Sequence, residues 1–537
     1  MLNNKIKHSV EQRSMLLQLL KNNAILRSYK LHLVNDLWKS YDQVIDCGDI
    51  VQGINPIDAG AHVLIKIVQN YIPDAFIEND TVFCNQCPAK HLDDIANQAR
   101  EHYVHIEKSD PVSDSKYIII STRWENQDQL HAYKDSLQFF ASVDHRRLGP
   151  ELELFFFSTY APGSAFWLDK GVTLRRIIQD RMRKNNQEYK NVEIQTPLIA
   201  HSMLWEQSGH LDKYTENIFT VSATTKNTER AYVLRPMNCP TCILTFNHSI
   251  HSYKDLPVRM AEFGLVHRNE PSGSMHGLFR ARSFTQDDGH IFCLPEQILQ
   301  EITSLIKQSL TLYQEMGFTE IDVKLSLRPD KRIGTDELWD QSEAQLKLSL
   351  EQSQIQYEIL PGEGAFYGPK IEFHLWDNFG RSWQCGTIQL DFSLPVKLDA
   401  TYIDHQGNKQ YPVMIHRAIL GSIERFIGIL LENCKGWLPI ALAPIQIAIL
   451  TVSQDSQSYA IKVKAMLEEV GFRVELGDQN LTVANKIRKY KSKKIPILAV
   501  IGQKEIQSET ISVQSYNQEL GLMTVADLIK YVRGNSH

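Results

Sequence analysis

The sequence lacks an uninterrupted apolar run long enough to cross a bilayer, and the apolar cluster Met15 to Leu20 is short and contains Gln18. We therefore expect a cytoplasmic protein with no membrane partner. Cysteine is also scarce. Eight cysteines without dense regular spacing argue against a disulfide scaffold and leave each one as a core residue or a metal ligand. The net charge of −6 predicts no general attraction to nucleic acid, so RNA binding requires a local basic patch.

The chain is long enough for several domains. Its 537 residues, 43% hydrophobic and 22% charged, favour three or four domains over one. We find no internal repeat, and residues 1–52 carry no motif that indicates a role. In residues 53–140 short apolar segments alternate with polar loops, and Lys170 to Asn186 then has the pattern of a charged amphipathic helix.

Residues 141–439 are rich in strand patterns and predict an α+β fold with an antiparallel sheet flanked by helices. Two segments alternate, Lys370 to Trp376 and Ser382 to Phe392. The second has a polar face of Thr387, Gln389 and Asp391 and an apolar face of Ile388, Leu390 and Phe392. We expect one face of the sheet to be solvated or to bind a ligand.

The helix near the end of this region carries an apolar stripe and leaves Arg425 free to point at a ligand. The stripe consists of Ile423, Phe426, Ile427, Leu430 and Leu431. After Pro439, residues 440–537 alternate strand and helix patterns, which predicts a separate small α/β domain.

The most informative segment runs from Arg280 to His290. If it forms a strand, its large functional side chains share one face, because side chains alternate with a period of two. That face carries Arg280, Arg282, Phe284, Gln286, Asp288 and His290. Guanidinium groups pair with phosphate, a ring stacks on a base, an amide and a carboxylate hold an amino acid, and an imidazole binds metal. The alternative is a polar surface strand.

From about residue 140 to its end, the chain resembles the threonyl-tRNA synthetases, a family of class II aminoacyl-tRNA synthetases. Six segments carry the resemblance: Arg235 to Pro240, His267 to Gly273, Phe284 to Asp288, Gly364 to Lys370, Trp383 to Thr387 and His416 to Ser422. Glu193 to Pro197 resembles motif 1, which implies a homodimer interface. His267 to Glu270, with the strand through His290, resembles motif 2, and Gly421 to Arg425 resembles motif 3.

The resemblance implies a threonine–tRNA ligase, which makes threonyl-adenylate from L-threonine and ATP and transfers threonine to the 3′ end of tRNA(Thr). Negative charge gathers on phosphoryl oxygens in such a reaction and must be met by fixed cations. Arg268 and Arg425 are the implied catalytic residues, on the α-phosphate and γ-phosphate respectively. Phe284 is implied to stack on adenine, and Mg²⁺ to screen the pyrophosphate. The other implied ATP-binding residues are Glu270, Arg280, Gln384, Thr387 and Ser422.

The resemblance also implies one zinc ion on Cys239, His290 and His416, whose spacing alone gives no metal signal. Three protein ligands leave a tetrahedral zinc one open position for a substrate. The implied threonine-binding residues are Met237, Gln286, Asp288, Tyr367 and Gln389. Valine lacks the hydroxyl and is rejected, whereas serine lacks only a methyl group, a difference of roughly 1–3 kcal/mol.

The chain departs from the family in its N-terminal part and beside the zinc ligands. Residues 53–140 resemble a reduced remnant of an editing domain, in which Asp58 replaces the first histidine before His62. We therefore expect editing within this chain to be lost. The segment Cys87 to His91 is a weak match to the second editing signature, or with Cys84 a small structural zinc site. Cys242, where the family has histidine, is either a further zinc ligand or a buried small side chain.

The C-terminal domain resembles the family's anticodon-binding domain only in part. Lys486 to Lys494 has six basic residues in nine, which predicts phosphate contact or a solvated basic helix. Asn480 and Glu505 are candidates for reading the anticodon, whereas Gln514 stands where an arginine is expected.

Two other functions stay open. One is a paralogue that makes threonyl-adenylate for another acceptor, such as a carrier protein, or serves as an inhibitor-resistant duplicate. The other is a non-catalytic regulator that binds tRNA or an amino acid, which the intact arginines and zinc positions disfavour.

Overall fold

The computed structural model describes residues 76–78, 81–84, 102–108, 117–123, 127–211, 215–225, 228–377, 381–478, 480–516 and 518–535. The chain divides into two compact units, one of Trp38–Ser142 and one that contains Val143–His537. Among the described residues, no helix combines the length and the apolar character that a membrane span requires.

The first unit contains a four-stranded sheet of order β1-β2-β4-β3. Its strands are β1 (Phe76–Glu78), β2 (Thr81–Cys84), β3 (His102–Lys108) and β4 (Tyr117–Arg123), and helix α5 (Gln127–Val143) follows. Cys84 is the last residue of β2. Asp58, His62, Cys87 and His91, on which the editing and second zinc predictions rest, lie outside the described residues.

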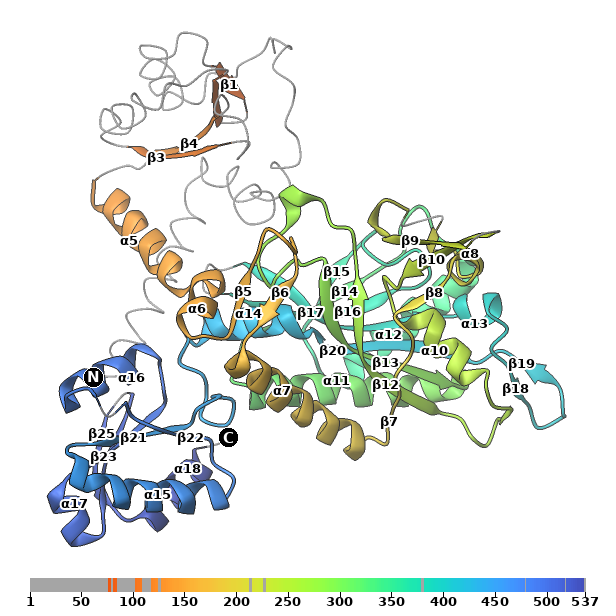
Figure 1. The fold of residues 1–537 in the computed structure, drawn as a ribbon. Helices are drawn as coiled ribbons and strands as arrows, with labels where there is room; N and C mark the ends of the chain where they lie inside the picture. Colours follow the sequence, from red (N-terminus) through yellow and green to blue (C-terminus); the bar gives the residue numbers. More distant parts are fainter. Residues whose placement is uncertain are drawn as a thin grey trace. The chain divides into compact units, whose positions relative to one another are not determined.

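The second unit contains an eight-stranded sheet of order β15-β14-β16-β17-β20-β13-β12-β7 (Figure 1). The strands are β7 (Val192–Glu193), β12 (Val258–His267), β13 (Ser283–Cys293), β14 (Ile321–Ser326), β15 (Glu358–Leu360), β16 (Lys370–Trp376), β17 (Ser382–Asp391) and β20 (Val413–Ser422). The two edge pairs are parallel and the pairs between them antiparallel. The predicted α+β fold with an antiparallel sheet is confirmed.

One face of this sheet packs against helices, and the other carries the polar side chains. The helices in the shared core are α6 (His145–Glu151), α7 (Asp169–Glu188), α11 (Ile298–Glu315), α12 (Asp336–Gln352) and α14 (Ile423–Asn433). Ile388 and Leu390 belong to that core and Phe392 packs against it, so the predicted two faces of β17 are confirmed. The predicted apolar stripe of α14 is also buried there.

Smaller elements surround the sheet. They are the hairpin β5 (Phe155–Phe157) and β6 (Ala165–Trp167), the sheet of β8 (Ile199–His201), β10 (Thr228–Leu234) and β9 (Thr220–Thr225), the sheet of β11 (His251–Ser252), β18 (Tyr402–Ile403) and β19 (Lys409–Gln410), and helices α8 (Ser202–Gln207), α10 (Cys239–Phe246) and α13 (Leu394–Lys397). Helix α10 starts at Cys239 and packs in an apolar cluster with residues of β13 and β20.

The C-terminal domain has a sheet of order β22-β21-β23-β24-β25 and a core of its own. Its strands are β21 (Ile447–Thr451), β22 (Val474–Leu476), β23 (Ile497–Ile501), β24 (Ile511–Ser515) and β25 (Glu519–Met523), and its helices are α15 (Gln457–Glu469), α16 (Val483–Ser492), α17 (Gln503–Ser508) and α18 (Val525–Gly534). The strand–helix alternation predicted from the sequence is confirmed.

One local prediction was wrong. The segment Arg280 to His290 is a strand only from Ser283, so Arg280 and Arg282 lie in the preceding loop. The backbone turns there because Gly277 has a φ of +53°, a conformation that glycine adopts without strain, and the Phe279 N–H donates to the His276 carbonyl. The alternation holds from Phe284 onward.

Candidate active site

Three elements bring Cys239, His290 and His416 together. The register of the antiparallel strands β13 and β20 sets His290 directly opposite His416, and Cys239 starts α10 beside them. One ligand atom from each residue lies within 4.8 Å of the other two, and all three residues are buried. His290 and His416 are thus adjacent through strand pairing and Cys239 through the position of α10, which their spacing in the sequence does not indicate.

The donor atoms of this cluster fit a zinc ion. His290 Nε2 is buried and has no hydrogen-bond partner. His416 Nε2 lies 2.9 Å from Asp391 Oδ2, and a carboxylate on one nitrogen of a histidine is the usual support for a metal on the other. One sulfur and two imidazole nitrogens are a donor set that zinc accepts. Burial raises the pKa of the Cys239 thiol and lowers the pKa of His290, so the imidazole stays in the neutral form that binds metal, and a bound cation would favour the thiolate of Cys239.

Polar side chains predicted to bind an amino acid surround the cluster. Asp288 is buried, which raises the pKa of its carboxyl group, and it accepts a 2.7 Å hydrogen bond from Asn238 Nδ2. The Tyr367 ring lies 5.5 Å from that of His416, and Gln389 Nε2 donates to the Gly368 carbonyl. Gln286 and Met237 flank this pocket: Asn238 Nδ2 is 3.5 Å from Gln286 Oε1, and Met237 packs against the cluster around Cys239.

Asn238 and Asp391 belong to this site, although the sequence reasoning did not select either residue. Asn238 lies inside the family segment Arg235 to Pro240. Gly264 packs directly against it, because a Cβ on that glycine would lie 2.3 Å from Asn238 Oδ1. Asp391 lies two residues after Gln389 on the polar face of β17, and this alternation is the sequence pattern that could have identified Asp391 as a site residue.

The predicted nucleotide-binding side chains gather at the next part of the sheet. The Arg268 guanidinium lies 5.2 Å from the centre of the Phe284 ring. Arg425 is held by two backbone carbonyls, with Nε donating to Phe279 and Nη1 to Gln384, each at 2.8 Å. Ser422 caps α14 by accepting from the Arg425 N–H, and Gln384 donates to Thr387. Burial, and to a smaller extent the positive charge of Arg268 and Arg280, lower the pKa of Arg425.

Arg280 and Cys242 have different surroundings from these residues. Arg280 is half-exposed and forms a 2.9 Å ion pair with Glu270. Cys242 is 1% exposed, packs in the apolar cluster around α10, and its sulfur lies 3.8 Å from Met260 Sδ. The Cys242 thiol faces the Met260 thioether and does not belong to the group of Cys239, His290 and His416 whose ligand atoms lie close together. The structure therefore favours a buried small side chain at Cys242 over a further zinc ligand.

The basic run of the C-terminal domain is largely committed to contacts within the protein. Lys486 is buried and donates to the Thr451 carbonyl, Lys489 pairs with Asp478, and Lys493 pairs with Glu153. Lys486 therefore does not offer its amine to a phosphate, because the amine is used inside the domain, and phosphate contact by the rest of the run stays a prediction. Arg488 is exposed.

The two anticodon candidates also differ in their surroundings. Asn480 is exposed, and its N–H donates to Asp478 Oδ1. Glu505 Oε2 accepts from the Gly502 N–H and caps α17. Asn480 therefore offers a free surface position, and Glu505 is held in place by its own helix.

Two family models match the chain over the two parts just described. Residues 219–434 match the tRNA synthetase class II core domain (G, H, P, S and T), and residues 446–535 match the anticodon binding domain. The fold is therefore that of a class II aminoacyl-tRNA synthetase.

Relatives narrow the class further. A threonine–tRNA ligase of Francisella philomiragia is 51% identical over 415 residues, 77% of this chain and 65% of that protein. The RNA binding domain of threonyl-tRNA synthetase from Cryptosporidium parvum is 39% identical with a TM-score of 0.69, over 73% of this chain and 98% of that one. Putative threonyl-tRNA synthetase ThrRS-1 of Aeropyrum pernix is 27% identical with a TM-score of 0.64, over 73% and 96%. The chain belongs to the threonyl-tRNA synthetase family. It spans 65% of the length of the first curated relative.

Proposed function

We propose that this chain is a threonine–tRNA ligase that activates L-threonine with ATP and transfers it to tRNA(Thr). The observation that carries the proposal is that two groups of side chains lie along the same strand, β13, which contributes His290 to one group and Phe284 to the other. One group surrounds Cys239, His290 and His416, and the other contains Arg268, Phe284 and Arg425. An amino acid and a nucleotide bound there would lie next to each other, as transfer of the adenylyl group requires.

The arginines supply the electrostatic part of the reaction. Arg268 meets the threonine carboxylate and the α-phosphate, Phe284 stacks on adenine, and Arg425 holds the γ-phosphate. Gln384, Thr387 and Ser422 line the nucleotide, and Mg²⁺ accompanies ATP. Arg280 and Glu270 begin as an ion pair, so a phosphate that binds Arg280 has to compete with the Glu270 carboxylate. Arg425, held by two carbonyls, is already oriented before ATP binds.

Cys239, His290 and His416 would hold one Zn²⁺, and Asp391 orients His416. When bound, the ion would act as a Lewis acid that coordinates the amine and the hydroxyl of threonine. Asp288, kept in place by Asn238, accepts a hydrogen bond from the same substrate groups. Gln286, Tyr367, Met237 and Gln389 complete the pocket.

We assign residues 141–439 to the catalytic domain, 440–537 to the anticodon-binding domain, 53–140 to the editing-type remnant and 1–52 to an extension of unknown role. Asn480 and Glu505 are the candidates for reading anticodon bases.

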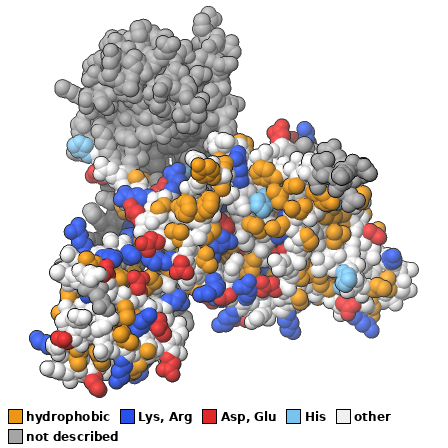
Figure 2. Space-filling model, in the orientation of Figure 1, with side chains coloured by type: hydrophobic (Ala, Val, Ile, Leu, Met, Phe, Trp, Pro, Cys, Tyr) orange, Lys and Arg blue, Asp and Glu red, His pale blue; other side chains and the backbone are white. Residues whose placement is uncertain are grey.

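We also propose a homodimer through motif 1, Glu193 to Pro197, which begins at the end of β7. Strand β7 is an edge strand with one neighbour, and apolar side chains are exposed in and after it, at Val192, Leu198 and Ile199. Figure 2 shows hydrophobic side chains also gathered on the face that carries the β5–β6 hairpin, where Phe156 and Phe166 stack and stay about 40% exposed.

The test is ATP–pyrophosphate exchange with threonine, serine and valine, followed by transfer of the activated amino acid to tRNA(Thr). Threonine should support exchange and transfer, valine neither, and serine exchange reduced by about 10- to 200-fold, the range for a missing methyl group in a pocket. Exchange without transfer to tRNA would contradict the ligase and support another acceptor. No exchange by zinc-loaded protein would contradict activation altogether and support a regulator.

A further inference from the structure

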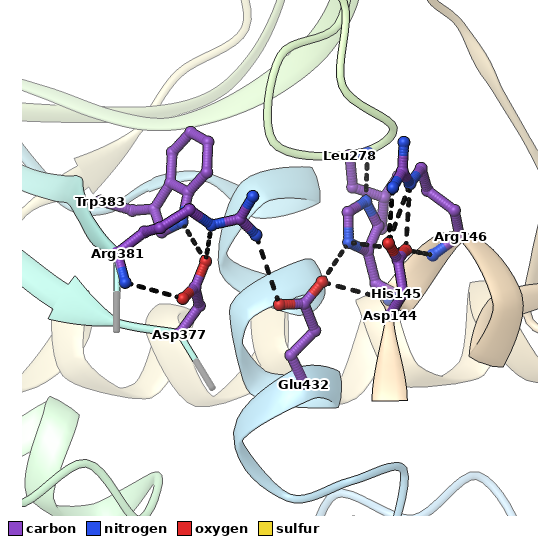
Figure 3. Close-up of polar contacts among 8 residues, drawn as sticks. All are labelled: Asp144, His145, Arg146, Leu278, Asp377, Arg381, Trp383 and Glu432. Atoms are coloured by element: carbon purple, nitrogen blue, oxygen red, sulfur yellow. Dashed lines mark hydrogen bonds and ion pairs between the residues drawn. The ribbon is translucent and has the colours of Figure 1, made fainter. Parts of the chain in front are cut away.

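A second buried group of titratable side chains lies outside the residues assigned above. Asp144 and His145 at the start of α6 meet Glu432 near the end of α14, and one ligand atom from each lies within 4.8 Å of the others (Figure 3). The side chains of His145 and Glu432 are fully buried. No family motif singled out these residues, and the proposed reaction does not use them directly.

Both nitrogens of the His145 ring are engaged. The Leu278 N–H donates to Nε2 at 3.0 Å, so Nε2 carries no proton. The proton is therefore on Nδ1, which donates to Glu432 Oε1 at 2.7 Å. The His145 backbone N–H donates to the same oxygen at 3.2 Å. The imidazole is thus a neutral bridge with one tautomer, fixed at both ends.

These contacts argue against a second metal site. A metal on His145 would need a nitrogen lone pair, and the lone pair of Nε2 already accepts from Leu278. The Arg146 guanidinium forms an ion pair with Asp144 at 2.6 Å. Burial alone would raise the pKa of the Asp144 carboxyl group, but the contact with Arg146 holds that pKa below its usual range. The fixed positive charge of Arg146 disfavours a cation beside it.

The residue that His145 holds is directly next to the anchor of a proposed catalytic arginine. Leu278 donates to His145, and the carbonyl of the next residue, Phe279, accepts from Arg425 Nε at 2.8 Å. The Phe279 ring also packs on the imidazole, with the ring centres 4.3 Å apart. The path from Glu432 to Arg425 therefore consists of three hydrogen bonds, the imidazole of His145 and two residues of the loop before β13, Leu278 and Phe279.

A glycine in the same loop shows how closely the loop is fitted to the ring. A Cβ on Gly277 would lie 2.2 Å from His145 Nε2, far inside contact distance, and its φ of +53° disfavours other residues. The loop can make the Leu278 bond only because residue 277 has no side chain.

A second chain of contacts leads from Glu432 to Arg425. Arg381 Nη2 lies 3.9 Å from Glu432 Oε2, and Arg381 Nε and Trp383 Nε1 both donate to Asp377 Oδ2, at 2.6 and 2.7 Å (Figure 3). The Arg425 guanidinium lies 5.8 Å from the centre of the Trp383 ring. Glu432 thus contacts both His145 and Arg381, the first residues of two chains of contacts that lead to Arg425.

We propose that His145, held by Glu432, is a positioning residue for ATP. It fixes the loop Gly277–Phe279, and through the Phe279 carbonyl it fixes Arg425 in the orientation that meets the triphosphate. This inference rests on the proposed role of Arg425, and His145 itself touches neither substrate. Loss of the His145 Nε2 acceptor would leave the buried Leu278 N–H unpaired and release the loop. Arg425 would then lose its fixed orientation, so the KM for ATP should rise while the threonine-binding residues stay in place.

The decisive pair of variants removes one end of the bridge at a time. His145→Asn keeps a donor near Nδ1 for Glu432 and loses the acceptor for Leu278, whereas His145→Gln keeps an acceptor near Nε2. In ATP–pyrophosphate exchange, His145→Asn should raise the KM for ATP about tenfold and change the KM for threonine less than about twofold. His145→Gln should keep the KM for ATP within about threefold of wild type. Gly277→Ala, which pushes the loop off the ring, should behave like His145→Asn.

The controls separate this proposal from the proposed function. Circular dichroism, thermal melting and zinc content verify that each variant is folded, and the affinity for a non-hydrolysable ATP analogue is measured by calorimetry. If wild type shows no exchange, the ligase proposal fails, and the calorimetric affinities of the Asn and Gln variants still decide the positioning role. Any of three results would overturn the positioning role of His145. These are equal changes in the KM values for ATP and threonine, equal behaviour of the two His145 variants, and wild-type ATP affinity in folded His145→Asn. If His145→Asn does not fold, Gly277→Ala decides by the same comparison.

Discussion

Two buried histidines in the described part of the chain can be compared, because each bonds a buried carboxylate: His416 with Asp391 at 2.9 Å and His145 with Glu432 at 2.7 Å. The two pairs differ in the use of the second ring nitrogen. The ring of His416 lies beside Cys239 and His290, and among the described residues the Nε2 of His290 has no hydrogen-bond partner. The second nitrogen of His145 accepts a backbone N–H. A carboxylate orients a histidine in both cases, and across the ring one histidine meets the proposed zinc ligands and the other a backbone N–H.

The charges around the two histidine–carboxylate pairs also differ, and this difference likewise favours a metal ion only at the first pair. The first group combines a thiol with two imidazoles and has no arginine bonded to its carboxylate Asp391 among the described hydrogen bonds. In the second, Arg146 and Arg381 lie beside Asp144 and Glu432. A cluster of His, Asp and Glu within ligand distance is therefore a metal site only where donors are left over and positive charge is absent.

The largest expected effect tests the first group against the second. His290→Ala should abolish stoichiometric zinc and lower threonine-dependent exchange by more than about 100-fold, because loss of a direct ligand exceeds the 10- to 100-fold cost of losing a supporting residue. His145→Gln should retain one zinc per chain. Metal content by mass spectrometry after gel filtration checks both. A full zinc complement in His290→Ala would show that the assignment of this histidine is wrong.

A smaller effect is expected when the two carboxylates are neutralised. Asp391→Asn should weaken zinc binding by about 10- to 100-fold, since His416 loses the acceptor for its Nε2 proton, whereas Glu432→Gln should leave zinc affinity unchanged. Asparagine keeps an oxygen for the Ser393 and Leu394 N–H groups that now bond Asp391 Oδ1, so the backbone stays capped. Competition with a chromogenic chelator measures the affinities. Equal weakening in the two variants would break the distinction between the pairs.

The sequence predicted one of these groups and not the other, for a physical reason. Cys239, His290 and His416 lie in segments that match family motifs, and the alternation in β13 and β17 places polar side chains on the correct face. His145 and Glu432 are 287 residues apart and lie in helices with no such pattern. Their meeting depends on how α6 packs against α14, which periodicity does not determine.

The same limit explains the local error at Arg280 and Arg282 and the burial of Lys486. The turn at Gly277 removes Arg280 and Arg282 from the strand, although their alternation with Phe284 continues in the sequence. Lys486 is buried because helix α16 turns its amine toward the Thr451 carbonyl, while its neighbours in sequence are equally basic. Composition identifies charged segments, but tertiary contacts decide which charges remain available.

The smallest effect is expected at Cys242, and it tests whether the first group is limited to three ligands. Cys242→Ala should keep one zinc per chain and change the KM for threonine less than about twofold, since the sulfur lies against Met260 in an apolar cluster. Its cost should be a loss of stability of about 1 kcal/mol, the central value for a single substitution, from the small cavity left beside α10. Zinc affinity, exchange kinetics and urea unfolding of the same preparation give the three values. A tenfold loss of zinc affinity in Cys242→Ala would instead make the thiol a ligand and close the position that threonine requires.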